Sequence, residues 1–278
     1  MLPTEEIDRR YLLRKINDQK IFIVSDLHLG FEEEWVQKGL NTRPPSWSFQ
    51  IIDTLHADLL KTKPDIMLIL GDLEHSFPHF NRGGGWVSNK WQDQKIVDFL
   101  LNKIEPLEFL QRIILVRGNQ DTLLLKLLEP HFDVLPSKGV ILFDNELGVF
   151  HGHVKPDPII CIASEIVLGH IHPAIELTDE LNIKYKLPVF VKLNLTREEV
   201  FNIFNFPIDL EDDVGLIDTV KLTILPTYNR FLGGFALNKP QKRSRSKPSY
   251  PVLQRLLQHP RLRVQMTNGV DLGELRNF

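Results

Sequence analysis

The sequence predicts an α/β fold, in which a mainly parallel sheet flanked by helices is followed by a second sheet. Short, uniformly apolar runs typical of buried strands recur along the chain, and each stops at a polar residue or a glycine. Longer segments with apolar residues near helical spacing separate the first three runs. Beyond residue 116 the runs come closer together and the helical segments become fewer, which indicates the second sheet.

The predicted strands are rich in Ile, Val, Leu and Phe, and they are Ile21–Val24, Ile66–Leu70, Ile113–Val116, Val140–Phe143, Val149–Phe150 and Ile166–Leu168. Between them, Ser46–Lys61 and the segment around Ile96–Leu100 have the spacing of helices that bury one face. Strand and helix therefore alternate as far as Val116, and this alternation predicts parallel pairing.

We expect a single domain over residues 1–278, with an acidic, partly helical insertion at 196–215 and a basic linker at 239–248. The linker precedes a closing unit of helix and strand at Pro251–Leu275. Five cations crowd into nine residues of this linker: Lys239, Lys242, Arg243, Arg245 and Lys247. Such a run is usually a solvated loop, and a patch that contacts phosphate groups is the alternative.

The composition predicts a cytoplasmic protein that does not enter a membrane. Hydrophobic residues make up 42% and charged residues 25% of the chain, which is ordinary for a globular domain. No segment approaches the ~18 consecutive apolar residues of a membrane-spanning helix, and the first residues lack the pattern of a secretory signal. Cys161 is the only cysteine, which fits a reducing compartment. The net charge of −3 gives no global attraction to nucleic acid.

Polar residues interrupt the chain where five of the predicted strands end. These segments are Ser25-Asp26-Leu27-His28, Gly71-Asp72, Gly118-Asn119-Gln120-Asp121, His151-Gly152-His153 and Gly169-His170-Ile171-His172. Because the carboxyl ends of parallel strands open onto one edge of a sheet, we expect these side chains to converge.

Divalent metal ions explain this set better than a nucleophilic side chain does. Carboxylate oxygens with imidazole nitrogens suit Mn, Fe or Zn, whereas an all-oxygen set would suit Mg or Ca. Each motif alone has a simpler reading, because an Asp-x-His is often a capping Asp with a surface His, and Gly71-Asp72 is an ordinary turn. Their joint occurrence at strand ends favours two ions about 3.5–4 Å apart, which serve phosphoryl transfer by activating a water.

These motifs, in this order, resemble the signature of the calcineurin-like metallophosphoesterase superfamily. Asp26-Leu27-His28-Leu29-Gly30, Gly71-Asp72-Leu73-x-His75 and Gly169-His170-Ile171-His172-Pro173-Ala174 are similar to a narrower branch of archaeal and bacterial phosphoesterases. Some bacterial members of that branch are associated with a DNA ligase. Leu225–Asn229 is similar to a late strand of the branch, and Asp271–Leu275 to its last strand.

The resemblance implies a two-sheet β-sandwich flanked by helices on both outer faces, and a dinuclear site. Asp26, His28 and His172 would hold one ion. Asn119, His151 and His170 would hold the other, with Asp72 bridging both. The expected cofactors are two divalent metal ions, with Mn²⁺ first and Fe, Zn, Ni or Mg as alternatives.

The third motif departs from the family, which usually has a histidine after the asparagine where this chain has Gln120. A glutamine donates a hydrogen bond but does not transfer a proton near neutral pH. His153 and His75 are the other candidates for a catalytic role, and His153 can instead orient a ligand. Three cations lie beside motifs and are candidates for phosphate contact: Arg82, Arg117 and Lys155.

The expected function is hydrolysis of phosphodiester or phosphomonoester bonds, with a phosphate ester as the binding partner. The alternative is a metal-holding scaffold whose catalysis is weakened by Gln120. A nuclease linked to DNA repair is a third reading, suggested by the ligase association and the basic run, and it implies nucleic-acid binding that weakens steeply with salt.

Overall fold

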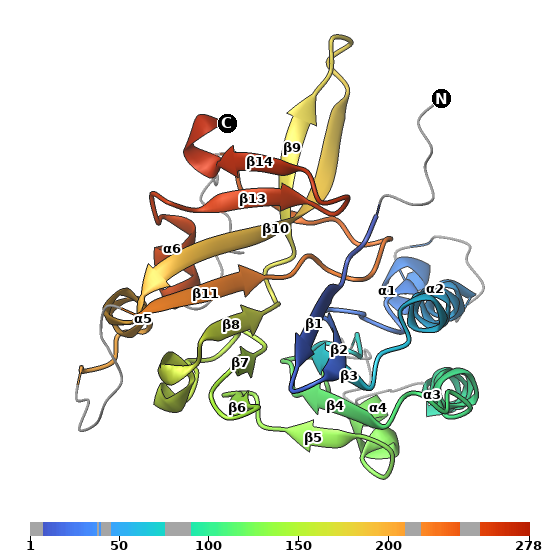
Figure 1. Cartoon of the computed structure of the whole chain (residues 1–278). Helices are drawn as coiled ribbons and strands as arrows, with labels where there is room; N and C mark the ends of the chain where they lie inside the picture. Colours follow the sequence, from blue (N-terminus) through green and yellow to red (C-terminus); the bar gives the residue numbers. More distant parts are fainter. Residues whose placement is uncertain (1–7, 38, 40–45, 76–89, 209–217, 240–250) are drawn as a thin grey trace, which may run out of the picture.

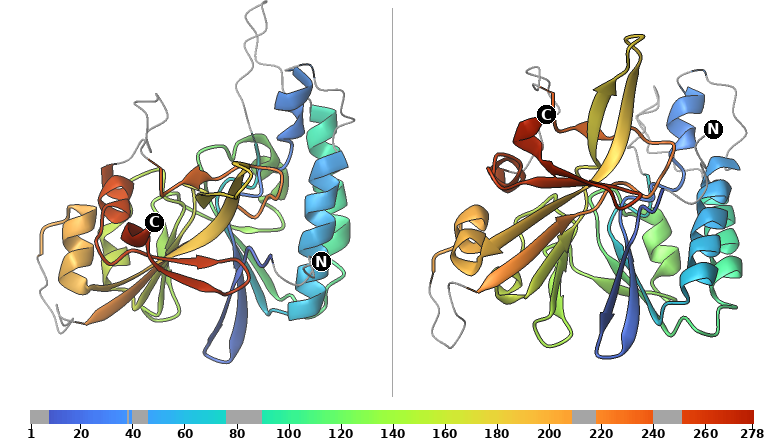
Figure 2. Two further views of the ribbon diagram at one scale, coloured as in Figure 1. Left: turned by 90° about the horizontal axis from the view of Figure 1, so that it is seen from above. Right: turned by 45° about the horizontal axis from the view of Figure 1, so that its top comes forward.

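The computed structural model describes residues 8–37, 39, 46–75, 90–208, 218–239 and 251–278. Two β-sheets pack face to face, and helices cover the outer face of each (Figure 1). The predicted class, a two-sheet sandwich flanked by helices, is confirmed. Figure 2 shows the same layers from above, with the helices of the two outer faces on opposite sides of the molecule.

The first sheet has the order β1-β2-β3-β4-β5, with all neighbours parallel except the β1–β2 hairpin. Its strands are β1 (Leu12–Ile16), β2 (Gln19–Val24), β3 (Ile66–Leu70), β4 (Arg112–Val116) and β5 (Asp133–Leu135). The helices on this side are α1 (Glu32–Gln37), α2 (Ser46–Thr62), α3 (Lys90–Ile104) and α4 (Leu123–Leu128). β3 is buried at every residue because helices cover one face and the second sheet covers the other.

The second sheet has nine strands, in the order β12-β9-β10-β11-β8-β7-β6, with β13 and β14 attached beside β10. They are β6 (Val140–Leu142), β7 (Leu147–Phe150), β8 (Glu165–Leu168), β9 (Pro173–Thr178), β10 (Lys184–Thr196), β11 (Thr219–Ile224), β12 (Phe235–Ala236), β13 (Arg263–Met266) and β14 (Asp271–Glu274). β7, β8 and β11 run parallel. The helical segments on this side are α5 (Arg197–Phe204), α6 (Pro251–Leu257), η1 (Pro158–Ile162) and η2 (Leu275–Asn277).

Three layers of buried apolar side chains hold the sandwich together. β2 shows how alternation divides them: Ile21 and Ile23 pack between the two sheets, whereas Phe22 and Val24 pack under the helices of the first sheet. The third layer lies between the second sheet and its helices. Because both sheets are packed on both faces, the ends of β2, β3, β4, β7 and β8 are held in fixed positions.

The segment Leu225–Asn229, expected to be a strand, is instead an irregular segment that follows β11. Pro226 has no N–H for a strand ladder. The backbone N–H of Tyr228 donates to the carbonyl of Ser25 at 2.9 Å, and the Thr227 hydroxyl donates to the carbonyl of Asp26 at 2.8 Å. The segment therefore crosses to the end of β2, where it supports the candidate site.

The structure describes the expected closing unit and part of the expected acidic segment. The closing unit contains a helix and two strands, α6, β13 and β14. α5 begins at a capping box between Thr196 and Glu199 and buries Val200 and Phe204 against the second sheet. The rest of the acidic segment at 209–215, the loop at 81–86 and the basic run at 240–247 lie outside the described residues. Among the described helices, none has the length and apolar character to cross a membrane.

Candidate metal centre

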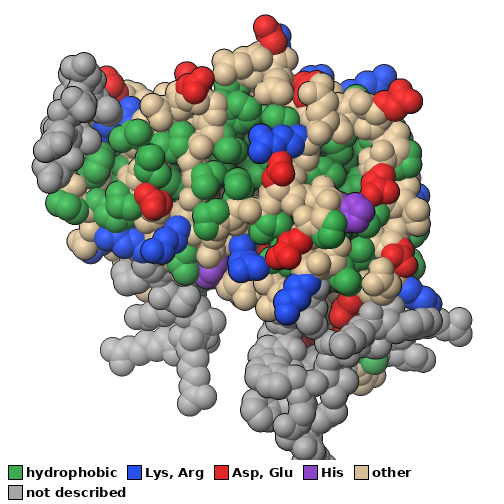
Figure 3. Space-filling model, turned by 90° about the horizontal axis from the view of Figure 1, so that it is seen from below, with side chains coloured by type: hydrophobic (Ala, Val, Ile, Leu, Met, Phe, Trp, Pro, Cys, Tyr) green, Lys and Arg blue, Asp and Glu red, His purple; other side chains and the backbone are tan. Residues whose placement is uncertain are grey.

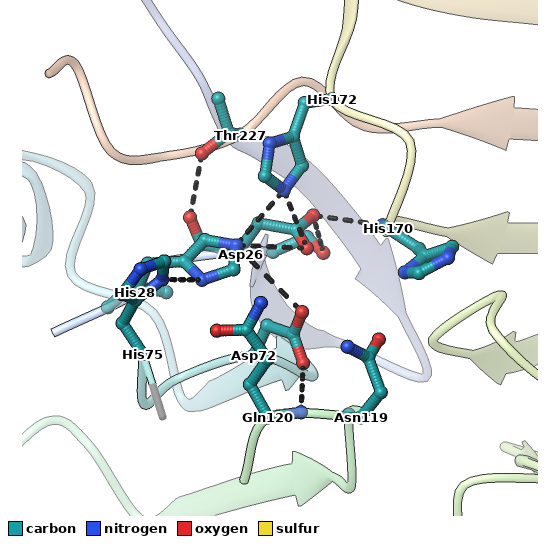
Figure 4. Close-up of polar contacts among 12 residues, drawn as sticks. Asp26, His28, Asp72, His75, Asn119, Gln120, His170, His172 and Thr227 are labelled. Carbon is teal, nitrogen blue, oxygen red and sulfur yellow. Dashed lines mark hydrogen bonds and ion pairs between the residues drawn. The ribbon is translucent and has the colours of Figure 1, made fainter. Parts of the chain in front are cut away.

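The predicted ligands come together where β2, β3, β4, β7 and β8 end. Figure 4 shows six of them gathered around one region: Asp26, His28, Asp72, Asn119, His170 and His172. Two groups of ligand atoms are each close enough to share an ion, since the atoms within a group lie within 4.8 Å of one another. The first group consists of Asp26, His28 and His172. The second group consists of Asp72, His151 and His170.

In the first group, the ligand atoms face one another. The Nε2 atoms of His28 and His172 are 3.1 Å apart, and Asp26 Oδ1 lies 3.2 Å from His172 Nε2 and 3.9 Å from His28 Nε2. The separation of the two nitrogens suits neighbouring ligands that are each about 2.1 Å from a shared ion. Asp26 is fully buried, and its Oδ1 atom has no hydrogen-bond partner among the residues that the structure describes.

The second group is built around His151, which is fully buried. Its Nδ1–H donates to the Leu70 carbonyl at 2.7 Å, which turns Nε2 toward Asn119 Oδ1 at 3.2 Å and Asp72 Oδ2 at 3.4 Å. The His170 ring stands edge-on to His151, with ring centroids 4.9 Å apart. A hydrogen bond from the other ring nitrogen to a carbonyl is the usual way to orient a metal-binding histidine.

Asp72 lies between the two groups. Its Oδ2 atom is 3.4 Å from His151 Nε2 and 3.8 Å from His28 Nε2. Its Oδ1 atom accepts a hydrogen bond from the backbone N–H of Gln120 at 2.9 Å. The carboxylate is therefore placed to serve both groups, as a bridging ligand must be.

Left-handed backbone turns aim five of these side chains at the centre. Asp26, His28, Asp72, His170 and His172 have φ angles of +59°, +47°, +48°, +74° and +47°. This conformation costs a residue with a side chain on the order of 1 kcal/mol or more, and it persists where the surroundings impose it. It also explains how His170 and His172, which would point to opposite faces of a regular strand, both reach the site.

Two glycines allow the backbone segments to approach closely. A Cβ atom on Gly118 would overlap the backbone nitrogen and the carboxylate of Asp72, and one on Gly169 would overlap the hydroxyl of Ser25. Side chains at these positions would push apart the strand ends that carry the ligands.

Two buried carboxylates hold the loops after β3 and β4 together, and the sequence alone gave them no role. Asp121 accepts hydrogen bonds from the backbone N–H groups of Gly118, Asp72 and Glu74, at 2.6, 3.0 and 3.1 Å. In return, Glu74 accepts from the backbone N–H groups of Thr122 and Leu124 at 2.8 and 3.0 Å. The signal in the sequence is their position beside the motifs, within Gly-Asn-x-Asp and directly after Gly-Asp-Leu.

Protonation in the site follows from burial and from the neighbouring charges. Burial, and next His172, lower the pKa of His28 to about 3, and burial with His151 lowers the pKa of His170 to about 4. Burial also opposes charge on Asp26, but the imidazoles around it, His172 foremost, bring its pKa below the usual value. Neutral imidazoles and an ionised carboxylate are the forms that bind divalent cations.

His151 differs from the other histidines. Burial lowers its pKa, but the Asp72 carboxylate, with Asp26 and the Leu70 carbonyl, together outweigh burial and raise the pKa to about 9. A proton on Nε2 would sit between Asp72 and Asn119, in the place that a cation would take. The donor set, the unpartnered Asp26 oxygen and the facing nitrogens fit a pair of divalent ions.

The three candidates for a catalytic role occupy different positions. Gln120 is half-buried next to Asp72. The His153 ring lies beside those of His151 and His170, with centroids 5.2 and 6.0 Å away, and its buried Nδ1 atom has no hydrogen-bond partner in the described part of the chain. His75 contacts the Nδ1 atom of His28, the ring nitrogen turned away from the first group.

Cations near the motifs are engaged elsewhere where they are described. Arg117 lies 4.0 Å from the Glu129 carboxylate, and Lys155 donates to the Asn205 carbonyl at 2.9 Å and lies over the Phe206 ring. Arg82 is outside the described residues. On the face seen from below, acidic and basic side chains are interspersed (Figure 3).

Comparison with solved structures gives distant likenesses. The nuclease MPE of Pseudomonas putida is 14% identical, with 94% of this chain and 100% of that chain covered and a TM-score of 0.48. Yfce, a phosphoesterase from E. coli, is 20% identical, with 60% and 76% covered and a TM-score of 0.33. No curated protein matches the chain.

The TM-scores of these two solved structures are below 0.5, so the family of this chain is assigned from its sequence match to a protein family. The model of the calcineurin-like phosphoesterases matches residues 19–191, more than half of the chain. This stretch spans all the predicted ligands, from Asp26 to His172. The chain belongs to the calcineurin-like phosphoesterase family, and it is a hydrolase.

Proposed function

We propose that this protein hydrolyses phosphodiester or phosphomonoester bonds with two divalent metal ions, Mn²⁺ by preference. Asp26, His28 and His172 hold one ion, Asn119, His151 and His170 hold the other, and Asp72 contacts both. When bound, the ions supply an activated water as nucleophile and neutralise the charge on the phosphate oxygens.

The proposal depends most on the buried Oδ1 atom of Asp26. A buried carboxylate oxygen without a hydrogen-bond donor is costly, on the order of 1–3 kcal/mol or more for a charged group. Here the ring nitrogens of His172 and His28 lie 3.2 and 3.9 Å from this oxygen, and neither makes a hydrogen bond to it. A cation held by all three groups removes the cost.

The remaining residues position and shape the site. Asp121 and Glu74 fix the loops that carry Asp72 and Asn119, and the Gln120 backbone N–H orients the Asp72 carboxylate. Burial, and then His151, lower the pKa of His153 to about 4. His153 is therefore neutral near pH 7 and serves as a hydrogen-bonding group, because an imidazolium donor would be scarce there.

The test is turnover of bis(4-nitrophenyl) phosphate and 4-nitrophenyl phosphate with added Mn²⁺. We expect turnover that chelator abolishes and Mn²⁺ restores, and that Asp26→Asn abolishes at every Mn²⁺ concentration. Asp133→Asn is the matched control, because Asp133 pairs with Arg112 on the surface and its loss should leave turnover unchanged. Turnover that survives both chelator and Asp26→Asn would contradict the proposal.

A second candidate function, a metal-binding scaffold with weak catalysis, is favoured by Gln120. This residue stands where the family usually has a histidine that protonates the leaving group, and loss of a general acid costs about 10²–10⁴ in rate. The contact between Gln120 and Asp72 uses the backbone, so ion binding does not require a histidine there. Two bound ions without turnover of either nitrophenyl ester would establish this candidate over the first.

A further inference from the structure

A chain of polar contacts runs from His28 away from the first group, and neither the family motifs nor the ligand set accounts for its far end. His28 Nδ1 lies 3.0 Å from His75 Nδ1, and His75 Nε2 lies 3.4 Å from Glu34 Oε2. The side chain of His75 is 8% exposed and that of Glu34 is 28% exposed. The chain joins the loop after β2, the loop after β3, and helix α1.

The positions of the protons in this chain follow from one requirement. If the Nε2 lone pair of His28 is to bind an ion, the proton of the neutral ring must be on Nδ1. That Nδ1–H then donates to Nδ1 of His75, which must carry a lone pair. The proton of His75 is therefore on Nε2, where it faces the carboxylate of Glu34, a group that only accepts when ionised.

The backbone holds His75 in place for this contact. Its N–H donates to the Leu29 carbonyl at 2.9 Å, one residue beyond His28, and the N–H of Leu29 donates to the Leu73 carbonyl at 2.8 Å. The His75 ring stands edge-on to both His28 and Phe31, with interplanar angles of 74° and 88°. Glu34 is the one member of the chain supplied by a helix, and it determines which nitrogen of His75 carries the proton.

We infer that Glu34, acting through His75, is a positioning residue that keeps His28 in the tautomer able to bind the ion of the first group. The inference rests on the proposed function, in which that group holds a metal ion. Hydrogen-bond partners behind metal-binding histidines typically contribute 10–100-fold in metal affinity. The low end, about tenfold, is expected here because Glu34 is partly exposed and its contact is long.

The test is calorimetric titration of the chelator-treated full-length chain with Mn²⁺. Glu34→Leu and His75→Phe each remove an acceptor, and we expect each to weaken one of two ions about tenfold and leave the other unchanged. Glu34→Gln and His75→Asn keep an acceptor oxygen, so they should retain most of the affinity. Glu33→Leu is the matched control, since Glu33 lies in the same turn of α1 and has no contact with His75 among the described interactions.

A second readout follows the proton itself. In the Co²⁺-loaded protein, the proton on His28 Nδ1 should give a hyperfine-shifted, exchangeable NMR signal that persists in wild type and in Glu33→Leu. It should broaden by exchange with water in Glu34→Leu and His75→Phe. If wild type and Glu34→Leu both bind two ions with equal Mn²⁺ affinity and give equal NMR signals, this inference is overturned while the proposed function stands. Failure of the wild-type chain to bind Mn²⁺ would overturn the proposed function and this inference with it.

Discussion

The two ligand groups differ in what they can do without a cation. In the second group, a proton on His151 lies within reach of Asn119 and Asp72, so the group can satisfy itself. In the first group, no described residue makes a hydrogen bond to Asp26 Oδ1, although the Nε2 atoms of His28 and His172 face each other. The second group can therefore exchange its cation for a proton, whereas the first group keeps a buried carboxylate oxygen that no described residue satisfies.

This difference indicates that the two ions are not equivalent. The Asp and His ligands of the two groups are buried alike, but the second site is the more open because its further ligand, Asn119, is exposed. We therefore expect the ion of the first group to bind more tightly and exchange more slowly. The ion beside Asn119 should be the one lost first on dialysis against a weak chelator or at lower pH.

The largest expected effect comes from Asp72→Ala, which removes the carboxylate common to both groups. Its loss leaves two cations with less compensating charge, so activity should disappear and at most one ion should remain per chain. Metal analysis after dialysis, together with turnover of a nitrophenyl ester, measures both. Retention of two ions in this variant would show that Asp72 is not a ligand shared by the two groups.

The next effect separates ion binding from catalysis. Gln120→His keeps the backbone contact with Asp72, so both ions should remain, and it restores a proton donor. The rate for esters with alkoxide leaving groups should rise about 10²-fold, and that for nitrophenyl esters much less. Small, equal changes for both kinds of substrate would show that Gln120 does not stand in the place of the acid.

A smaller effect is expected for Asp121→Asn, which should act mainly on the second group. The amide offers one acceptor fewer to the backbone N–H groups of Gly118, Asp72 and Glu74. Leaving a buried donor unsatisfied costs about 1–3 kcal/mol in the free energy of unfolding. Denaturant unfolding should show this loss, and Mn²⁺ titration should show weaker binding of the second ion. Equal weakening of both ions would remove the distinction between the groups.

The last effect is the pH dependence of stability in the chelator-treated protein, and it has opposite signs for the two groups. The folded-state pKa of His28 is lowered to about 3, so its contribution is present above about 6.5 and is lost as the pH falls toward 3. That of His151 is raised to about 9, so its contribution is present below about 6.5 and is lost as the pH rises through 9.

Thermal melting of two variants separates these contributions. His28→Gln should reduce the loss of stability on the acid side and leave the alkaline side unchanged. His151→Gln should do the reverse. The comparison would fail if both variants altered the same side of the profile.

The sequence was informative where strands are short, apolar and followed at once by a ligand. β3 is buried along its whole length and ends directly at Gly71-Asp72, so both the strand and its polar end could be predicted. β10 could not be predicted, because its first three residues are exposed in a hairpin and its apolar run is broken by Pro188 and by polar residues. Local pattern also does not reveal that Leu225–Asn229 leaves its sheet to hold the end of β2.

Within the site, the motifs identified the candidate metal ligands. They did not identify the residues that hold those ligands in position. Asp121 and Glu74 act through backbone N–H groups on each other's loops, a relation that depends on how the strand ends meet. Glu34 comes from a helix that no ligand motif includes. The left-handed turns at Asp26 and His28 likewise arise from packing, since neither residue type requires them.

Anomalous scattering from a crystal grown with Mn²⁺ tests the central claim most directly, because it locates each ion. The account predicts two anomalous peaks per chain. One should contact Asp26, His28 and His172, the other Asn119, His151 and His170, with Asp72 touching both. The peak in the first group should remain after a brief soak in weak chelator, while the second fades. A single peak, or ions bound away from these residues, would contradict the account.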